Sequence, residues 1–97
     1  MQVDFSAPIL DLNGQPLVDD NGPVNLGVIC LQALLANHDE DRNLSGLEKV
    51  RRFNLATEIH ANKIVNVSAE DIALLKQLVA RSFIVLVTGR AWALLDP

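Results

Sequence analysis

The sequence predicts an α+β domain in which a small antiparallel sheet packs against three to four helices. Two serine-led patterns, SGLE at residues 45–48 and SAED at 68–71, are typical of helix N-termini. An Asn-Gly dipeptide at residues 13–14 favours a β-hairpin. The chain has 97 residues, of which 49% are hydrophobic. That length supports one modest core, so residues 1–97 are expected to form a single domain.

The sheet is expected to consist of an N-terminal hairpin and one later strand. Residues 9–18 form the hairpin in this prediction, because Asn13-Gly14 tolerates the positive φ angles of a two-residue type I′ turn. Pro16 lacks an amide hydrogen, which places its strand at an edge. Residues 63–67 are β-branched with partial alternation and predict a third strand. We expect this strand to join the hairpin, because an isolated hairpin is marginally stable in water.

Three helices are predicted by their start signals and apolar spacing. The first covers residues 26–36, with Asn25 as its cap, and is apolar nearly all round except for Gln32. The two serine-led patterns open the second and third helices, expected over residues 45–60 and 68–81. In each, the serine hydroxyl accepts from an amide three residues later, and the acidic side chain reaches back to the serine amide.

The last segment fits two secondary structures. Residues 83–88 have the composition of a buried strand, whereas the apolar residues from Ile84 to Leu95 follow a helical spacing. We favour a helix over 84–95, kinked or started near Gly89, because glycine costs a helix about 1 kcal/mol relative to alanine. A strand over 83–88 remains the alternative.

Charge argues against a nucleic-acid partner. The formal net charge is −4, and only 4% of residues are aromatic. Binding to DNA or RNA depends on neutralising phosphates, and stacking binders need aromatic platforms on a basic groove.

The sequence shows no recognisable signal peptide or membrane-spanning segment. The N-terminal residues lack a basic region followed by an apolar stretch, and the longest apolar run, residues 83–87, is far shorter than the roughly 20 residues that span a bilayer. We therefore expect a cytoplasmic protein without a membrane partner. The single Cys30 excludes an intramolecular disulfide and is expected to be a small buried hydrophobe.

Catalytic and cofactor motifs are not recognisable. His38 and His60 have no evident nucleophile partner, and Ser45 and Ser68 are explained as helix caps. The glycines do not form a phosphate-binding loop. The acidic run at 39–41 beside His38 does not follow a calcium-loop pattern, so a solvated loop is expected there. The sequence therefore predicts a protein that is not an enzyme and needs no metal or cofactor.

Four residues are candidates for an interaction site. Lys49, Arg51 and Arg52 form a basic cluster in the second predicted helix, which is either a patch for an acidic partner or an ordinary solvated face. Trp92 is the only tryptophan. It is either the anchor of the C-terminal helix or an interface hot spot, since tryptophan is enriched at both.

Five segments resemble small uncharacterised proteins encoded by tailed bacteriophages and prophages. They are ILDLNGQP (9–16), LGV (26–28), LSGLEKV (44–50), SAEDI (68–72) and VTGRAW (87–92). The resemblance covers nearly the full length and implies a phage accessory protein with an opening hairpin followed by helices. It implies a role in virion assembly and no particular functional residue.

Together these observations favour a non-enzymatic protein that acts through protein–protein interaction. Residues 26–36 and 72–95 carry more apolar surface than a core of this size is expected to hide, and surplus apolar surface usually becomes an interface. The partner is unknown, and a homodimer is one expectation. The alternative is a small regulator that binds nucleic acid or a component of the transcription machinery.

Overall fold

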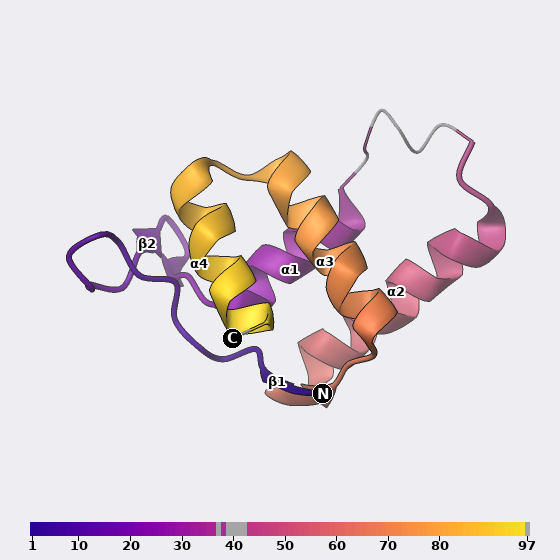
Figure 1. Ribbon diagram of the computed structural model, residues 1–97, viewed down its shortest axis with the longest axis horizontal. Helices are drawn as coiled ribbons and strands as arrows, with labels where there is room; N and C mark the ends of the chain where they lie inside the picture. Colours follow the sequence, from indigo (N-terminus) through magenta and orange to yellow (C-terminus); the bar gives the residue numbers. More distant parts are fainter. Residues whose placement is uncertain (37, 39–42, 97) are drawn as a thin grey trace.

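The computed structural model confirms the α+β class. The structure describes residues 1–36, 38 and 43–96, and the acidic run at 39–41 lies outside them. Within the described chain, four helices carry most of the structure, and two small antiparallel sheets, of two strands each, complete it (Figure 1).

The helices begin where their caps predict. The four helices are α1 (Leu26–Leu35), α2 (Gly46–Ala61), α3 (Ala69–Ser82) and α4 (Val85–Leu95). Asn25 accepts a hydrogen bond from the amide of Val28 at 2.9 Å. Ser45 and Ser68 each accept one from the amide three residues later, at 3.1 Å. Each of these bonds satisfies one of the free amides that every helix start exposes, which fixes the first residue of α1, α2 and α3.

The sheet differs from the prediction in its pairing. Strand β4 (Ile64–Asn66) exists, but its antiparallel partner is β1 (Gln2–Asp4), with Val3 opposite Val65. Within the predicted hairpin, residues 9–18, the structure has an isolated antiparallel bridge between Leu10 and Pro16. A separate antiparallel pair follows it, β2 (Val18–Asp19) with β3 (Gly22–Pro23). The expected single sheet of hairpin plus later strand is therefore wrong in this detail. Alternating Val3 and Phe5 place two buried side chains on the core side of the N-terminal segment, which gives β4 a better partner than the hairpin.

The turn at residues 13–14 is present with a different geometry. Gly14 has a φ of 81°, but among the described residues no residue other than glycine has a positive φ, so the type I′ turn expected at Asn13-Gly14 is wrong. The amide of Gly14 donates to the carbonyl of Asp11 at 3.1 Å, and the amide of Asp11 donates to the carbonyl of Gln15 at 2.8 Å. These bonds form a three-residue loop that ends on a left-handed glycine.

The C-terminal segment is a helix. Helix α4 runs from Val85 to Leu95 through Gly89, and Ile84 precedes it without a side-chain cap. A Cβ added at Gly89 would meet no heavy atom within 4 Å, so this glycine does not serve close packing. The burial of Val87, Ala91 and Leu95 on one side of α4 explains why the helical spacing prevails over the strand-like composition.

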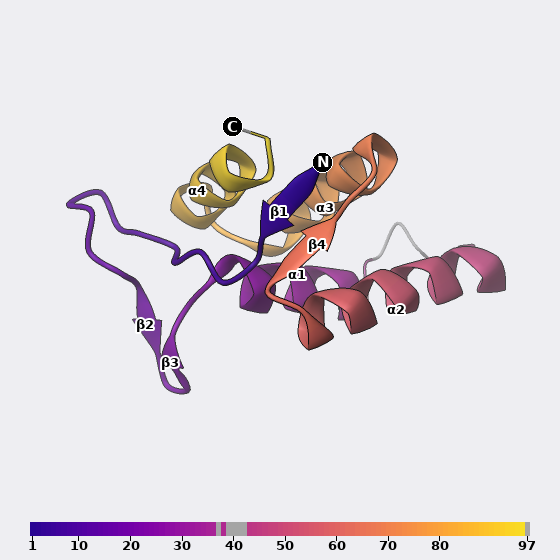
Figure 2. The ribbon, with the colours of Figure 1, turned by 90° about the horizontal axis from the view of Figure 1, so that it is seen from below.

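Helix α1 is the centre of the molecule. It packs against α2, α3 and α4, and α3 and α4 lie side by side (Figures 1 and 2). Six of its ten residues are buried, which agrees with its apolar composition on nearly all sides. The amide of Gly27 donates to the carbonyl of Phe5 at 2.8 Å, and this bond ties the start of α1 to the segment that follows β1.

Candidate interaction site

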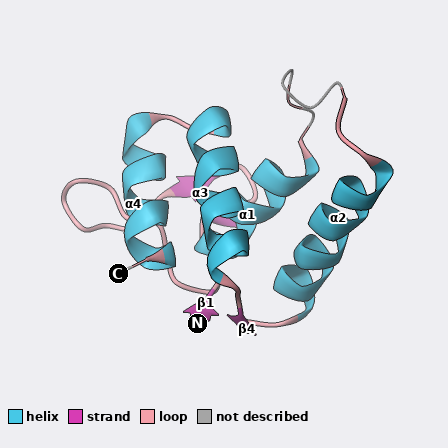
Figure 3. Cartoon of the chain, turned by 45° about the vertical axis from the view of Figure 1, so that its right-hand side comes forward, coloured by secondary structure: helices cyan, strands magenta, loops and turns pink. Residues whose placement is uncertain are grey.

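Helix α2 forms one edge of the molecule. It packs against α1 and touches β4, while its opposite side points away from the other helices (Figures 1 and 3). Its buried residues are Arg52, Leu55, Ala56 and Ile59, which lie along one side of the helix. Most of the other residues of α2 are exposed.

The side of α2 opposite the core carries no charge. At 100° per residue, seven positions fall within an arc of about 120° that faces away from the buried side. We call this the outer face of α2, and it consists of Gly46, Leu47, Val50, Phe53, Asn54, Thr57 and Ala61. Leu47, Val50 and Phe53 are 83%, 54% and 62% exposed.

The polar residues of this face are partly satisfied within the helix. The Thr57 hydroxyl donates to the carbonyl of Phe53 at 2.9 Å. This bond engages the only hydroxyl of the outer face, so the face is uncharged and weakly polar along the whole helix. Exposed apolar residues that are scattered singly are ordinary, but an uncharged stripe along one helix is typical of a contact surface.

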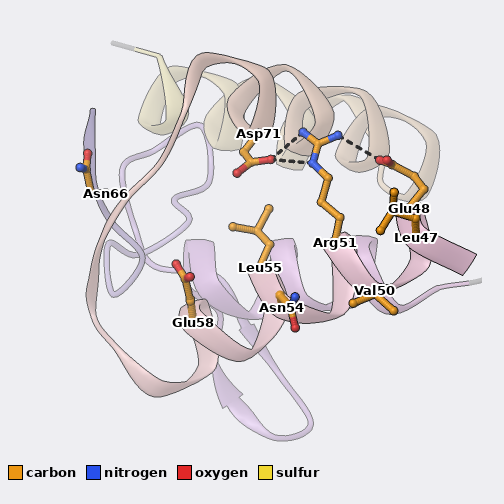
Figure 4. Close-up of a pocket in the computed structure, with 9 residues that line it drawn as sticks. All are labelled: Leu47, Glu48, Val50, Arg51, Asn54, Leu55, Glu58, Asn66 and Asp71. Carbon is orange, nitrogen blue, oxygen red and sulfur yellow. Dashed lines mark hydrogen bonds and ion pairs between the residues drawn. The ribbon is translucent and has the colours of Figure 1, made fainter.

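A groove of about 470 Å³ runs along one flank of the outer face, between α2 and the start of α3 (Figure 4). Arg51 lies between two carboxylates there: its Nη1 is 3.0 Å from Glu48 Oε1 and its Nη2 is 2.6 Å from Asp71 Oδ1. The hydrogen bond to Asp71 is the largest of the effects that raise the pKa of the Arg51 guanidinium. Leu55, Asn54 and other residues of α2 line the rest of the groove.

The two carboxylates of this ion pair come from the two serine-led helix starts. Glu48 and Asp71 are the third residues of α2 and α3, where the sequence predicts that each reaches back to its capping serine. Within the described chain both carboxylates instead bind Arg51, and only the serine half of each capping box is formed. One arginine therefore connects the first turns of two helices.

The other flank of the outer face holds a smaller and more apolar pocket. It has a volume of about 230 Å³ and lies between α1 and α2. Its lining residues are mostly apolar: Leu31, Leu35, Phe53, Ala56, Thr57 and His60. Leu35 is 63% exposed at the end of α1, so the apolar surface continues from α2 onto α1.

The structure separates the three residues of the predicted basic cluster. Arg52 is buried, at 9% exposure, on the side of α2 that faces the core, whereas Lys49 is exposed. Arg51 is engaged with Glu48 and Asp71 in the groove. Lys49 and Arg52 are three residues apart and lie on neighbouring parts of the helix surface, whereas Arg51 points to the other flank, so the three cations do not form one patch.

Trp92 connects α4 to α3. Its Nε1 donates to the carbonyl of Lys76 at 3.0 Å, and the Lys76 ammonium lies 5.3 Å from the centre of the indole ring. Lys76 also pairs with Asp96 at 2.9 Å. Trp92 remains 41% exposed, so it holds the two helices together and also presents part of its ring to solvent.

The outer face of α2 is the feature that the sequence did not single out. The sequence pattern that marks it is a series of uncharged residues at positions 46, 50, 53 and 57, spaced three or four residues apart as on one side of a helix. The charged residues between these positions make α2 resemble an ordinary surface helix. The sequence instead attributes surplus apolar surface to 26–36 and 72–95, and most of the apolar side chains of α1 are buried.

Among the described residues, no three histidine, cysteine or acidic side chains are placed to hold a metal ion together. The part of the chain that the structure describes also contains no helix with the length and apolar character needed to cross a membrane. No family model, curated protein or solved structure matches the chain.

Proposed function

We propose that this protein is a non-enzymatic accessory protein that binds another protein through the outer face of α2. The observation that carries the proposal is the uncharged outer face itself, with Leu47, Val50 and Phe53 exposed along it. Interface cores are depleted in charged residues and enriched in aromatic ones, and this face has no charged residue and carries the aromatic Phe53 near its middle.

The two concavities beside the outer face support the same proposal. The apolar pocket between α1 and α2 has the size and lining to receive one large apolar side chain of a partner. The groove on the other flank offers Glu48, Arg51 and Asp71 as a polar rim. An apolar centre with a polar rim is the usual anatomy of a protein–protein interface.

The biological setting that we propose is the bacterial cytoplasm during phage or prophage expression. The segments that resemble tailed-phage proteins suggest a role in assembling the virion head or tail. The resemblance names no partner, so the experiment has to identify the contact surface without assuming one.

Photo-cross-linking from position 53 tests the proposal. Phe53, which is 62% exposed, is replaced by p-benzoylphenylalanine, a phenylalanine with a photoreactive benzoyl group on its ring, and cells that produce the protein are irradiated. The matched control carries the same group at Val85, which is 90% exposed at the start of α4. We expect a discrete cross-linked product from position 53 and none from position 85. No product from position 53 would refute the proposal.

The alternative, a regulator that binds nucleic acid, has less support. It needs a basic surface, whereas Arg52 is buried and Arg51 already binds two carboxylates. It predicts binding that weakens steeply with salt and is lost when Arg51 and Arg52 are neutralised. An interaction through the outer face of α2 is instead insensitive to the removal of nucleic acid by nuclease.

A further inference from the structure

We infer that Asn21 is a site of spontaneous deamidation and that Arg90 protects the corresponding site at Asn13. The two asparagines are alike in sequence, because each precedes a glycine, whereas every other asparagine of the chain precedes a residue with a side chain. Both are exposed in turns, and each donates its backbone amide to the carboxylate of an aspartate two residues earlier, at 2.8 Å. The contacts around the two turns differ, and they predict which asparagine reacts first.

The reaction uses groups of the chain and one molecule of water. The amide nitrogen of Gly22 gives its proton to a solvent base and forms a bond to the side-chain carbonyl carbon of Asn21. The bond from that carbon to the side-chain nitrogen breaks, and the nitrogen takes a proton from solvent and leaves as ammonia. Water then opens the five-membered succinimide ring at either carbonyl, which leaves aspartate or isoaspartate without any oxidation or reduction. Glycine favours this ring closure because it has no side chain beside the attacking nitrogen, and the space beside Gly22 is open, since a Cβ there would meet nothing within 4 Å.

The turn that contains Asn21 can open without disturbing the core. It closes the β2–β3 pair, in which Asp19 lies opposite Gly22. Each strand of this pair has two residues, and both residues of β2 are exposed. The base of the hairpin is held below this pair, where the amide of Val24 donates to the carbonyl of Leu17 at 2.9 Å. Opening of the turn therefore uncovers no buried side chain, and short exposed strand pairs open readily, which lets the amide nitrogen of Gly22 reach the side chain of Asn21.

The turn that contains Asn13 is held closed through Asp11. The carbonyl of Asp11 accepts from the amide of Gly14 at 3.1 Å and from Arg90 Nη2 at 2.7 Å. The carboxylate of Asp11 accepts from the amide of Gln15 at 3.0 Å, and the amide of Asp11 donates to the carbonyl of Gln15 at 2.8 Å. The nitrogen that would have to attack, the amide of Gly14, is thus engaged inside a loop that α4 also holds. Hydrogen bonds from a charged group are stronger than neutral ones, so the contact with Arg90 makes this loop harder to open.

Deamidation at Asn21 changes both the charge and the backbone of the turn. Aspartate at this position adds one negative charge to the formal −4 of the chain, directly after Asp19 and Asp20. Isoaspartate also inserts a methylene group into the backbone, which lengthens the turn that joins Asp19 to Gly22. The β2–β3 pair lies at one end of the molecule and the start of α2 at the other (Figures 1 and 2). The inference therefore does not depend on the proposed function.

Mass spectrometry of the aged protein measures the two reaction rates. The purified chain is kept folded at mildly alkaline pH beside a sample unfolded in guanidinium chloride, and each conversion adds about 1 Da. Trypsin releases residues 1–42 as one peptide, whose fragmentation assigns the modified asparagine. We expect conversion in the folded protein to be about tenfold faster at Asn21 than at Asn13, and the two rates to be similar in the unfolded sample. Conversion in the folded protein that is equally fast at both sites or faster at Asn13 overturns the inference, as does no conversion at Asn21 while the unfolded sample converts.

Three variants test the reacting residue and the protection separately. Asn21→Gln should remove the fast conversion, because glutamine would have to close a larger ring, whereas the matched control Asn13→Gln should convert like the wild type. Arg90→Met keeps an unbranched side chain but removes the hydrogen bond to Asp11, so it should speed conversion at Asn13 about fivefold to tenfold and leave Asn21 unchanged. Fast conversion that persists in Asn21→Gln overturns the first part of the inference. An unchanged rate at Asn13 in Arg90→Met, or an equal rise at both asparagines, overturns the second.

Discussion

Arg51 in α2 binds Asp71 in the first turn of α3 through a single carboxylate oxygen. Arg51 Nη2 lies 2.6 Å from Asp71 Oδ1, and Arg51 Nε lies 3.2 Å from the same oxygen. The two residues are the only ion pair in the described chain that spans these two helices. The amide of Asp71 also donates to the hydroxyl of the capping Ser68, so the same residue takes part in the start of α3 and in the ion pair with α2.

Removing this ion pair is expected to cost little stability. Asp71→Asn should lower the free energy of unfolding by about 0.5–1 kcal/mol, because the pair is partly exposed and water screens it. Urea unfolding at low and high salt measures the effect, which should shrink as salt rises. The control is Glu70→Gln, the neighbouring acid of the same helix turn, which makes no ion pair in the described chain and should cost less. A salt-independent loss would show that the pair acts through packing.

Two glycine substitutions are expected to change the free energy of unfolding in opposite directions. Gly89→Ala should stabilise the protein by about 1 kcal/mol, because Gly89 is exposed inside α4 and its Cβ would meet nothing. Gly27→Ala should destabilise it by about 1–3 kcal/mol, because its Cβ would lie 3.0 Å from the carbonyl oxygen of Phe5. Thermal unfolding of both variants measures the difference. Equal effects would mean that the start of α1 can move away from the N-terminal segment.

Trp92 is expected to stabilise the packing of α4 on α3 through its indole amine. Trp92→Phe keeps an aromatic ring but removes the hydrogen bond to Lys76, and it should cost about 0.5–1.5 kcal/mol in urea unfolding. Lys76→Met removes both the cation above the ring and the ion pair with Asp96, and it should cost about 0.5–1 kcal/mol. The double variant should lose less than the sum, since the two residues are in contact. Full additivity would show that the ammonium and the indole do not interact.

Stability is expected to fall at alkaline pH because of Cys30. Burial raises the pKa of its thiol from an ordinary 9.0 to about 12, so the unfolded chain releases this proton at lower pH than the folded chain. The contribution is complete below about pH 9 and is lost as the pH rises toward 12. Urea unfolding between pH 8 and 11, compared with Cys30→Ala, measures this slope. The chain has no tyrosine, and the titration of its lysines is common to both proteins, so it cancels in the comparison. If the free energy of unfolding fell equally with pH in the wild type and in Cys30→Ala, the prediction would be wrong.

The sequence predicts the helices well because their start signals are local. Asn25, Ser45 and Ser68 each act on an amide three residues away, so the first residue of each helix can be read within a few positions. The spacing that favours a helix at the C-terminus is also local, and α4 confirms it. The sequence does not predict the partners of Glu48 and Asp71, because their binding to Arg51 depends on how α2 and α3 pack.

The strand pairing and the outer face could not be predicted in the same way. Strand β1 has only three residues, and its partner β4 (Ile64–Asn66) is far from it along the chain, so no local pattern marks the pair. The separation of Lys49, Arg51 and Arg52 depends on which side of α2 meets α1, which composition does not reveal. Val50 and Phe53 are exposed for the same reason, because they lie on the side of α2 that does not meet α1.

The pairing of β1 with β4 has a consequence for the order in which the protein folds during synthesis. The N-terminal strand leaves the ribosome first, but it has no partner until Ile64–Asn66 has been made. Helix α1, the most apolar of the four, likewise stays uncovered until α2 and α3 follow it. The nascent chain therefore carries its most apolar helix without its packing partners until α3, which ends at Ser82, has been synthesised.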